Sequence, residues 1–216
     1  MKPAIVLLLL ASAAPAAAEV VDRIAVSVAG QVVTLSDIRR HIRIMAFLQK
    51  TKPEFSEARL RSTAELLIDQ ALVRREAELS RYPAPADPEI QQALAQSAES
   101  LGLTRQQMFA EALEYGFSEQ EIRDLAAWRL TLIRFIDYRF RPSVQVSEAD
   151  IAVYYNDVFL PQFRARSAGA AHPALDSIRE RIVDILNTEL ATQAAQSWLE
   201  QTRKMTRIRY FDEAFK

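Results

Sequence analysis

The chain has 216 residues, which is enough for one or two domains with a substantial hydrophobic core. Its 27 basic and 28 acidic residues leave a formal net charge of −1, so the chain lacks the positive charge typical of nucleic-acid binding. Cysteine is absent, which excludes thiol nucleophiles, cysteine-based zinc sites and disulfides.

The first eighteen residues have the pattern of a secretory signal peptide. Lys2 precedes an apolar run that begins at Ala4, and the alanines that end at Ala18 form a small-residue cleavage site. We therefore expect cleavage after Ala18 and export of residues 19–216. The apolar run is short for a membrane span, and an uncleaved N-terminal anchor is the alternative.

A β-hairpin is predicted directly after this segment. Two β-rich runs, Val20–Val28 and Gln31–Leu35, flank a turn at Ala29-Gly30, and glycine adopts positive φ at little cost. The only later run with comparable β character is Thr206–Phe211. Because a lone hairpin is marginal in water, we expect this C-terminal strand to join the hairpin in one small sheet.

Most of the remaining chain has the three- and four-residue apolar spacing of amphipathic helices, so the fold class is predicted to be mainly α. The expected helices run from an N-cap at Ser36 to about Lys50, from an N-cap at Ser56 to about Ser80, from an N-cap at Asp87 to about Leu101, and over Arg105–Tyr115, Glu119–Arg141, Glu148–Phe159 and Ala174 to about Lys204. The segment Leu160–Pro173 lacks periodicity and is predicted to be a loop.

Three of these helix starts carry the signature of a capping box together with a hydrophobic staple. The boxes are Thr104 with Gln107, Ser118 with Glu121 and Ser147 with Asp150, and the staples are Leu103 with Met108, Phe117 with Ile122 and Val146 with Ile151. These pairs fix how the chain enters each helix, so the three boundaries are well defined by the sequence.

No catalytic or metal-binding constellation emerges from the residues. The two histidines, His41 and His172, are far apart, and no HExxH, phosphate-binding glycine loop, dinucleotide fingerprint or GxSxG motif occurs. We therefore expect no catalytic residue, no metal and no cofactor. A basic cluster at Arg39, Arg40, His41 and Arg43 is either an anion site or a solvated helix face, and the lack of a glycine-rich loop favours the solvated face.

Apolar and aromatic surface is the remaining functional feature. Methionine and aromatic side chains suit the binding of extended or unfolded chains, because they adapt to a partner and bury large areas. The candidate client-binding residues are Phe47, Leu48, Met108, Phe109, Leu113, Trp128, Phe135, Tyr154, Tyr155 and Phe159. For each of them, ordinary core packing is the alternative interpretation.

Several segments, taken in order, resemble the SurA-type periplasmic chaperones. The run VVDRIAVSVAGQVVTLSDI at the hairpin is similar to the start of that family. Glu65–Leu79 resembles its second helix, Leu101–Leu125 its next helical hairpin, and Val146–Asp157 the helix that precedes its isomerase domain. The helix 174–204 with the strand 206–211 resembles the segment that closes the chaperone module.

One departure from the family changes the expected activity. Typical members carry parvulin prolyl isomerase domains before the closing helix, whereas only Val158–Pro173 occupies that place here. The resemblance therefore implies a chaperone module over residues 19–216 without isomerase activity. It implies ATP-independent binding of unfolded outer-membrane or secreted polypeptides in the periplasm, without nucleic acid or a small-molecule cofactor, and self-association is possible.

Two other functions stay open at this point. The protein is alternatively a structural or accessory protein that binds one folded partner, or an isomerase, which the missing domain disfavours. We expect substitution of Ile24, Val26 or Ile208 to unfold the module. Substitution of client-facing aromatic residues should instead leave it folded and inactive.

Overall fold

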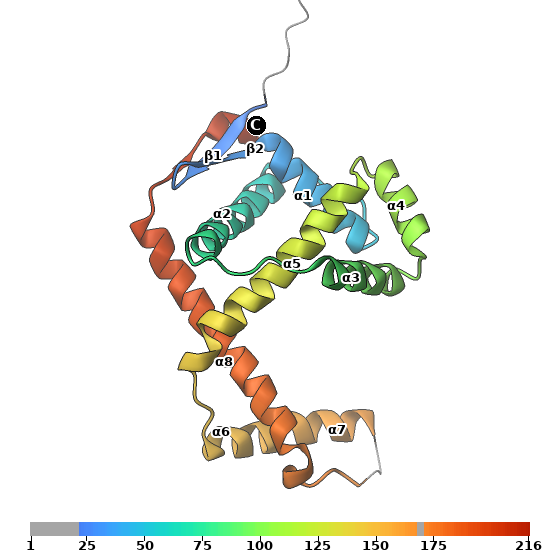
Figure 1. Ribbon diagram of the computed structural model, residues 1–216, viewed down its shortest axis with the longest axis vertical. Helices are drawn as coiled ribbons and strands as arrows, with labels where there is room; N and C mark the ends of the chain where they lie inside the picture. The colour runs from blue at the N-terminus through green and yellow to red at the C-terminus, as the bar shows by residue number, and fades with distance from the viewer. Residues whose placement is uncertain (1–21, 168–170) are drawn as a thin grey trace, which may run out of the picture.

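A computed structural model describes residues 22–167 and 171–216 (Figure 1). The predicted signal peptide and its cleavage site lie outside these residues. The elements are β1 (Ile24–Val28), β2 (Gln31–Thr34), α1 (Leu35–Leu48), α2 (Glu57–Leu79), α3 (Asp87–Ser100), α4 (Arg105–Glu114), α5 (Glu119–Arg139), α6 (Glu148–Val153), α7 (Leu160–Arg166), α8 (Leu175–Met205) and β3 (Ile208–Tyr210). The predicted fold class, mainly α with a small sheet, is confirmed.

The sheet joins the two ends of the described chain, as the sequence predicted. Ala29 and Gly30 have φ values of 51° and 86°, which is the type I′ geometry that matches the twist of a hairpin. The strand order is β2-β1-β3, and both pairings are antiparallel. Val26 pairs with Val33 on one side and with Tyr210 on the other, so β1 is the central strand.

All three predicted capping boxes are confirmed. At the start of α5, for example, the Ser118 N–H donates to Glu121 Oε2 at 2.7 Å, and the Glu121 N–H donates to Ser118 Oγ at 3.3 Å. Two donors that would otherwise lack partners are thereby satisfied, which defines where the helix begins.

Two predicted N-caps are wrong by one or two residues. Thr34, not Ser36, caps α1, because the residue three positions after Thr34 is Asp37, whose carboxylate accepts from the Thr34 N–H at 3.0 Å. Ala86, not Asp87, precedes α3, and the Glu89 carboxylate accepts from its N–H at 2.8 Å. In both cases the acidic residue at the third helical position decides the boundary.

The predicted loop over Leu160–Pro173 is also wrong in part, because α7 covers Leu160–Arg166. A π-helical segment, Tyr154–Phe159, connects α6 to α7. Hydrogen bonds in a π segment span five residues, so the apolar phase shifts there and the usual helical periodicity is lost. In addition, α7 has only seven residues, LPQFRAR, and too few large apolar side chains to show a clear helical period.

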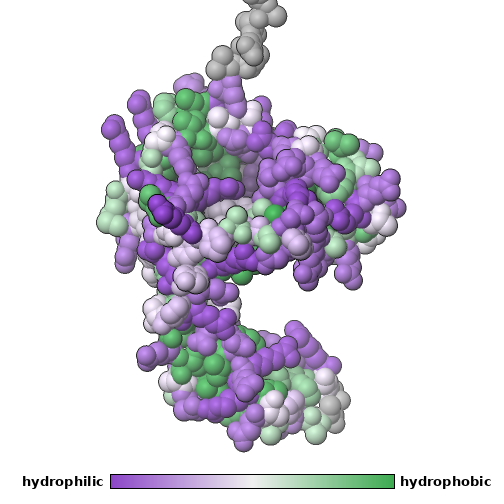
Figure 2. Space-filling model, in the orientation of Figure 1, coloured by the Kyte–Doolittle hydropathy of each residue, from purple (hydrophilic) through white to green (hydrophobic). Residues whose placement is uncertain are grey.

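The helices form a main body and a second lobe. The main body contains the sheet, α1 to α5 and the C-terminal half of α8, and it holds three adjoining hydrophobic clusters. The second lobe consists of α6, the π-helical segment, α7 and the N-terminal half of α8, which pack around Ile151, Tyr155, Leu160 and Ile182. Figure 2 shows open space between the two parts on one side of the molecule.

Helix α8 connects the two parts and is anchored firmly at its C-terminal end. It has 31 residues and is therefore about 45 Å long. Near its end, Arg203 forms ion pairs with Glu65 and Asp69 of α2. The Tyr210 hydroxyl of β3 donates to Glu65 Oε1 at 2.8 Å, so polar contacts and strand pairing both hold this end to the main body.

The C-terminal turn, Asp212–Phe215, packs against the core on one face of the sheet. Phe215 is 1% exposed and lies in the cluster that contains Val26 and Ile68. The Arg61 guanidinium lies 4.7 Å from the centre of its ring. The expected role of Val26 in stability agrees with its complete burial, but Ile24 is 45% exposed and contributes little to that core.

We predict that Phe215→Ala lowers the free energy of unfolding by about 3–5 kcal/mol, because it removes a fully buried ring from a closed core. Ile24→Ala is the matched control on an exposed side chain and should change that free energy by less than about 0.5 kcal/mol. Urea denaturation followed by circular dichroism measures both. Equal effects of the two substitutions would contradict the role assigned to the C-terminal turn.

Candidate functional site

The structure places the ten candidate client-binding residues in three environments. Phe47, Met108, Trp128, Phe135 and Tyr155 are buried, Leu48, Phe109, Tyr154 and Phe159 are partly buried, and Leu113 is 66% exposed. Two of the buried rings pack edge-on against other rings: Phe47 against Phe117 at 5.3 Å, and Phe135 against Phe140 at 5.7 Å. Core packing therefore accounts for the buried half of the set, which leaves the other half as surface candidates.

A groove in the second lobe brings Tyr154 and Phe159 together. It has a volume of about 300 Å³ and lies between the π-helical segment, α7 and α8. Its apolar walls are Tyr154, Phe159, Phe163, Ile178, Ile182 and Ile185. Arg166 and Arg181 lie at the same groove, so its walls are apolar with basic groups beside them. We call it the second-lobe groove.

The aromatic residues that line the second-lobe groove are Tyr154, Phe159 and Phe163, and the buried ring of Tyr155 stacks against Phe159. The rings of Tyr155 and Phe159 are 5.7 Å apart, and those of Phe159 and Phe163 are 5.8 Å apart. The Tyr155 hydroxyl donates to the Pro173 carbonyl at 2.7 Å, which ties the start of α8 to the same helix. The four-residue spacing of the three rings aligns them along one side of the helix. Sequence reasoning missed Phe163 because it assigned this segment to a loop.

Two further grooves lie along α5 in the main body. The first has a volume of about 240 Å³ and is lined by Leu48, Ala93, Leu130 and Ile133, among others. The second has a volume of about 510 Å³ and is lined by Tyr82 and Tyr138, together with residues of α5 that include Arg134 and Asp137. Ile133 and Tyr138 are 58% and 77% exposed. Ile133 and Tyr138 therefore form the most exposed apolar surface of α5. Among the ten candidate client-binding residues, only Leu48 lines either of these two grooves.

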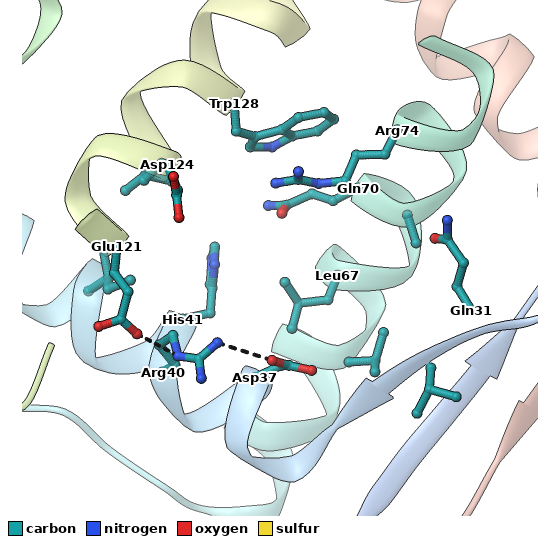
Figure 3. A pocket seen from close by; sticks show the side chains of 15 residues that line it. Gln31, Asp37, Arg40, His41, Leu67, Gln70, Arg74, Glu121, Asp124 and Trp128 are labelled. Carbon is teal, nitrogen blue, oxygen red and sulfur yellow. Dashed lines mark hydrogen bonds and ion pairs between the residues drawn. The ribbon is translucent and has the colours of Figure 1, made fainter. Parts of the chain in front are cut away.

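A central pocket of about 340 Å³ lies between β2, α1, α2 and α5 (Figure 3). Its polar wall holds Arg40, which forms ion pairs with Glu121 at 2.7 Å and with Asp37 at 3.2 Å. Both carboxylates also cap helices, so all three charges are engaged within the protein. Ile44, Leu67, Leu125 and Trp128 supply the apolar part of the lining.

The Arg74 guanidinium covers Trp128 in this pocket, with its central carbon 4.1 Å from the centre of the ring. Burial lowers the pKa of Arg74, and the carboxylates of Glu78 and Asp124 oppose that effect. Within the described part of the chain, no carboxylate lies within ion-pair distance of this guanidinium. Arg74 is therefore a partly desolvated cation whose hydrogen-bond donors face the pocket (Figure 3).

His41 points into the middle of the central pocket (Figure 3). Its Nε2 atom is buried and has no hydrogen-bond partner among the residues described. Burial lowers the pKa of His41, and the positive charges of Arg129 and Arg59 lower it further. The interpretation of Arg39–Arg43 as a solvated helix face is therefore wrong for His41, because tertiary packing encloses it.

A scan against protein-family models found no match, and a search of curated proteins found none either. Across residues 22–167 and 171–216, no group of three or more His, Asp and Glu side chains is arranged to hold a metal ion. No helix within these ranges is both long and apolar enough to span a membrane.

The buried neutral imidazole predicts a specific dependence of stability on pH. Because the folded state lowers the pKa of His41, the unfolded chain binds its proton more tightly. The free energy of unfolding should therefore fall as the pH drops through the ordinary value of 6.5. His41→Gln should flatten the profile between about pH 7.5 and 5.5, a window that lies above the ordinary carboxylate pKa values.

Urea titrations of both proteins across this window provide the measurement. The difference in slope between the wild-type protein and His41→Gln isolates the histidine, because every other titrating group is shared. Coincident slopes would show that the imidazole is not desolvated in the folded protein.

Proposed function

We propose that the protein is an ATP-independent periplasmic chaperone that binds unfolded outer-membrane proteins. The observation that supports this proposal best is the distribution of apolar surface over separate grooves on two lobes. Each groove is of a size to take one or two side chains, between about 240 and 510 Å³. Such a surface suits a long, flexible ligand more than a compact small molecule.

The length of the molecule suits an extended client. Helix α8, which connects the second lobe to the main body, is about 45 Å long, and an extended polypeptide advances by about 3.3 Å per residue. A segment of about 14 residues is therefore as long as α8. Several weak contacts linked by one chain give a useful overall affinity through their high effective concentration.

Weak individual contacts also account for release without nucleotide. Apolar burial contributes about 25 cal/mol per Å² before the entropic cost of ordering the client is subtracted. A single groove therefore retains one client side chain only briefly, and the client can leave stepwise as it begins to fold. Export to the periplasm rests on the sequence pattern of residues 1–18, which lie outside the described structure.

The direct test is aggregation of an unfolded β-barrel client. We expect the purified protein, at modest molar excess and without ATP, to slow light scattering by such a client after dilution from urea. The same protein should release the client to lipid vesicles. No effect on aggregation would refute the chaperone proposal, and capture of one folded protein at fixed stoichiometry would favour an accessory role.

The aromatic wall of the second-lobe groove offers a sharper prediction. Tyr154→Ser combined with Phe163→Ser removes two of its rings, and we expect client affinity to fall by about tenfold. Val153→Ser is the matched control, because Val153 is the adjacent residue, is 58% exposed and does not line the groove.

Fluorescence anisotropy with a labelled unfolded client measures the affinities, and circular dichroism verifies that both variants fold. Equal affinities for the double variant and the control would remove the second-lobe groove from the binding surface.

Prolyl isomerase activity is expected to be absent. Between the π-helical segment and α8, the chain provides only α7 and a short connection, residues 167–174. A proline-containing tetrapeptide in a coupled proteolysis assay should isomerise at the uncatalysed rate. Turnover above that rate would revive the isomerase alternative.

A further inference from the structure

The outer edge of β2 borders the central pocket and is free to pair with another strand. Only β2 contributes sheet residues to the pocket lining, namely Gln31, Val32 and Val33. The side chains of Val32 and Val33 point to opposite faces of the sheet, so a pocket that touches both lies beside the strand. The strand order β2-β1-β3 makes this the unpaired side of β2.

The hydrogen-bond pattern identifies which backbone groups face that edge. The Ala29 N–H donates to the Arg207 carbonyl, and the Phe211 N–H donates to the Ala25 carbonyl, so odd-numbered residues of β1 face β3. Even-numbered residues of β1 therefore face β2 and include Val26 and Val28, the partners of Val33 and Gln31. Because the pattern alternates along β2, the N–H and C=O of Val32 point outward.

These two groups of Val32 have no hydrogen-bond partner in the part of the chain that the structure describes. The next outward N–H, that of Thr34, is already satisfied by the Asp37 carboxylate. Val32 is 48% exposed, so an incoming backbone has access to it. The edge is thus one residue long, which limits self-aggregation while it leaves one donor and one acceptor for a partner.

We propose that the edge of β2 and the central pocket form one binding site, in which an extended, uncharged client segment pairs with Val32 and inserts an apolar side chain between α1, α2 and α5. This inference rests on the proposed chaperone function and names the site and the chemistry of the bound segment. Strand addition supplies affinity through the backbone, and the neighbouring pocket supplies selectivity for one side chain.

The charges and polar groups of the pocket favour an uncharged segment. Arg40 is neutralised by its own ion pairs, and Arg74 and Asp124 carry opposite charges on neighbouring helices. His41, Gln70 and Gln31 line the same space, and no side-chain hydrogen bond from them occurs within the described ranges. Peptide groups, which donate and accept equally, match such a mixed lining without leaving a buried charge unpaired.

Trp128 provides a direct probe of this site. The chain has two tryptophans, so Trp198→Phe leaves Trp128 as the only one. The probe ligand is a blocked nine-residue peptide of alternating threonine and valine with a central phenylalanine. We expect it to shift the emission of Trp128, and we expect the same peptide with N-methylated amides beside the phenylalanine to bind about tenfold more weakly.

Val32→Pro tests the edge from the side of the protein. Proline is tolerated on an edge strand where the N–H faces outward, and it removes that donor without touching the β1–β2 ladder. We expect Val32→Pro to weaken peptide binding by about tenfold, while Val32→Ala, which keeps the N–H, binds within about threefold of the parent protein.

The outcomes are distinguishable from one another. If Val32→Pro fails to fold, the N-methylated peptide still decides the question on the parent protein. Equal binding of both peptides, or unaltered binding to a folded Val32→Pro variant, would overturn the inference. The inference would also be overturned if the wild-type protein were a dimer, Val32→Pro were a monomer, and the peptide did not shift the Trp128 emission. That result would assign the edge of β2 to a second copy of the chain. The wild-type protein and Val32→Pro can also be compared in the client aggregation assay. If both slow aggregation equally, this site is rejected and the chaperone proposal stands.

Discussion

The pairing of β1 with strands from both ends of the described chain is the constraint on which the rest of the structure depends. Strand β3 follows α8 directly, so the β1–β3 ladder fixes the C-terminal end of a 31-residue helix against the main body. The ion pairs of Arg203 with α2 hold the last turns of that helix in the same orientation. The second lobe packs on the opposite end of α8, so its position depends on how β1, α2 and α5 hold that helix.

The same pairing leaves β2 as an outer strand. With β1 occupied on both sides, only β2 and β3 have free edges, and the helices α1, α2 and α5 enclose a pocket beside β2. A longer free edge would favour aggregation, but Asp37 caps the outward N–H of Thr34 and shortens it. The cap of α1 thus has two consequences, because it begins a helix and also limits the exposed edge.

Many of the exposed side chains that line the grooves are distinct from those that fill the core. The adjoining clusters of the main body contain the fully buried rings and aliphatic side chains, such as Phe135, Phe215 and Met108. Phe163, Ile133 and Tyr138 line the grooves and are partly or largely exposed. Under the proposed chaperone function, these exposed groups can vary while the fold is maintained.

The central pocket differs from the grooves in its polarity. A buried polar atom carries a high cost when it lacks a partner, so a pocket with a buried His41 Nε2 that has no partner among the described residues is a costly feature for folding alone. Functional sites commonly carry such local costs, because a ligand completes the missing hydrogen bonds. The polarity of the pocket therefore supports a role in binding beyond that of a packing defect.

Local sequence patterns were sufficient to predict the features that depend on neighbours along the chain. The type I′ turn at Ala29-Gly30, the three capping boxes and the match between the hairpin and the C-terminal strand all follow from local chemistry, and the structure has each of them. The Thr34 and Ala86 caps were readable in principle from Asp37 and Glu89, whose carboxylates occupy the third helical position.

The distinction between apolar faces that form the core and apolar faces that stay at the surface required the folded structure. An apolar stripe shows that a helix face is removed from water. It does not show whether that face packs against the protein or is available to a ligand, so the sequence could not distinguish the buried Trp128 from the partly exposed Leu48. Likewise, His41 is enclosed only because α2 and α5 pack over α1, and Phe163 lies at the second-lobe groove because α7 packs against α8. These outcomes depend on contacts between residues distant in sequence, which no local pattern specifies.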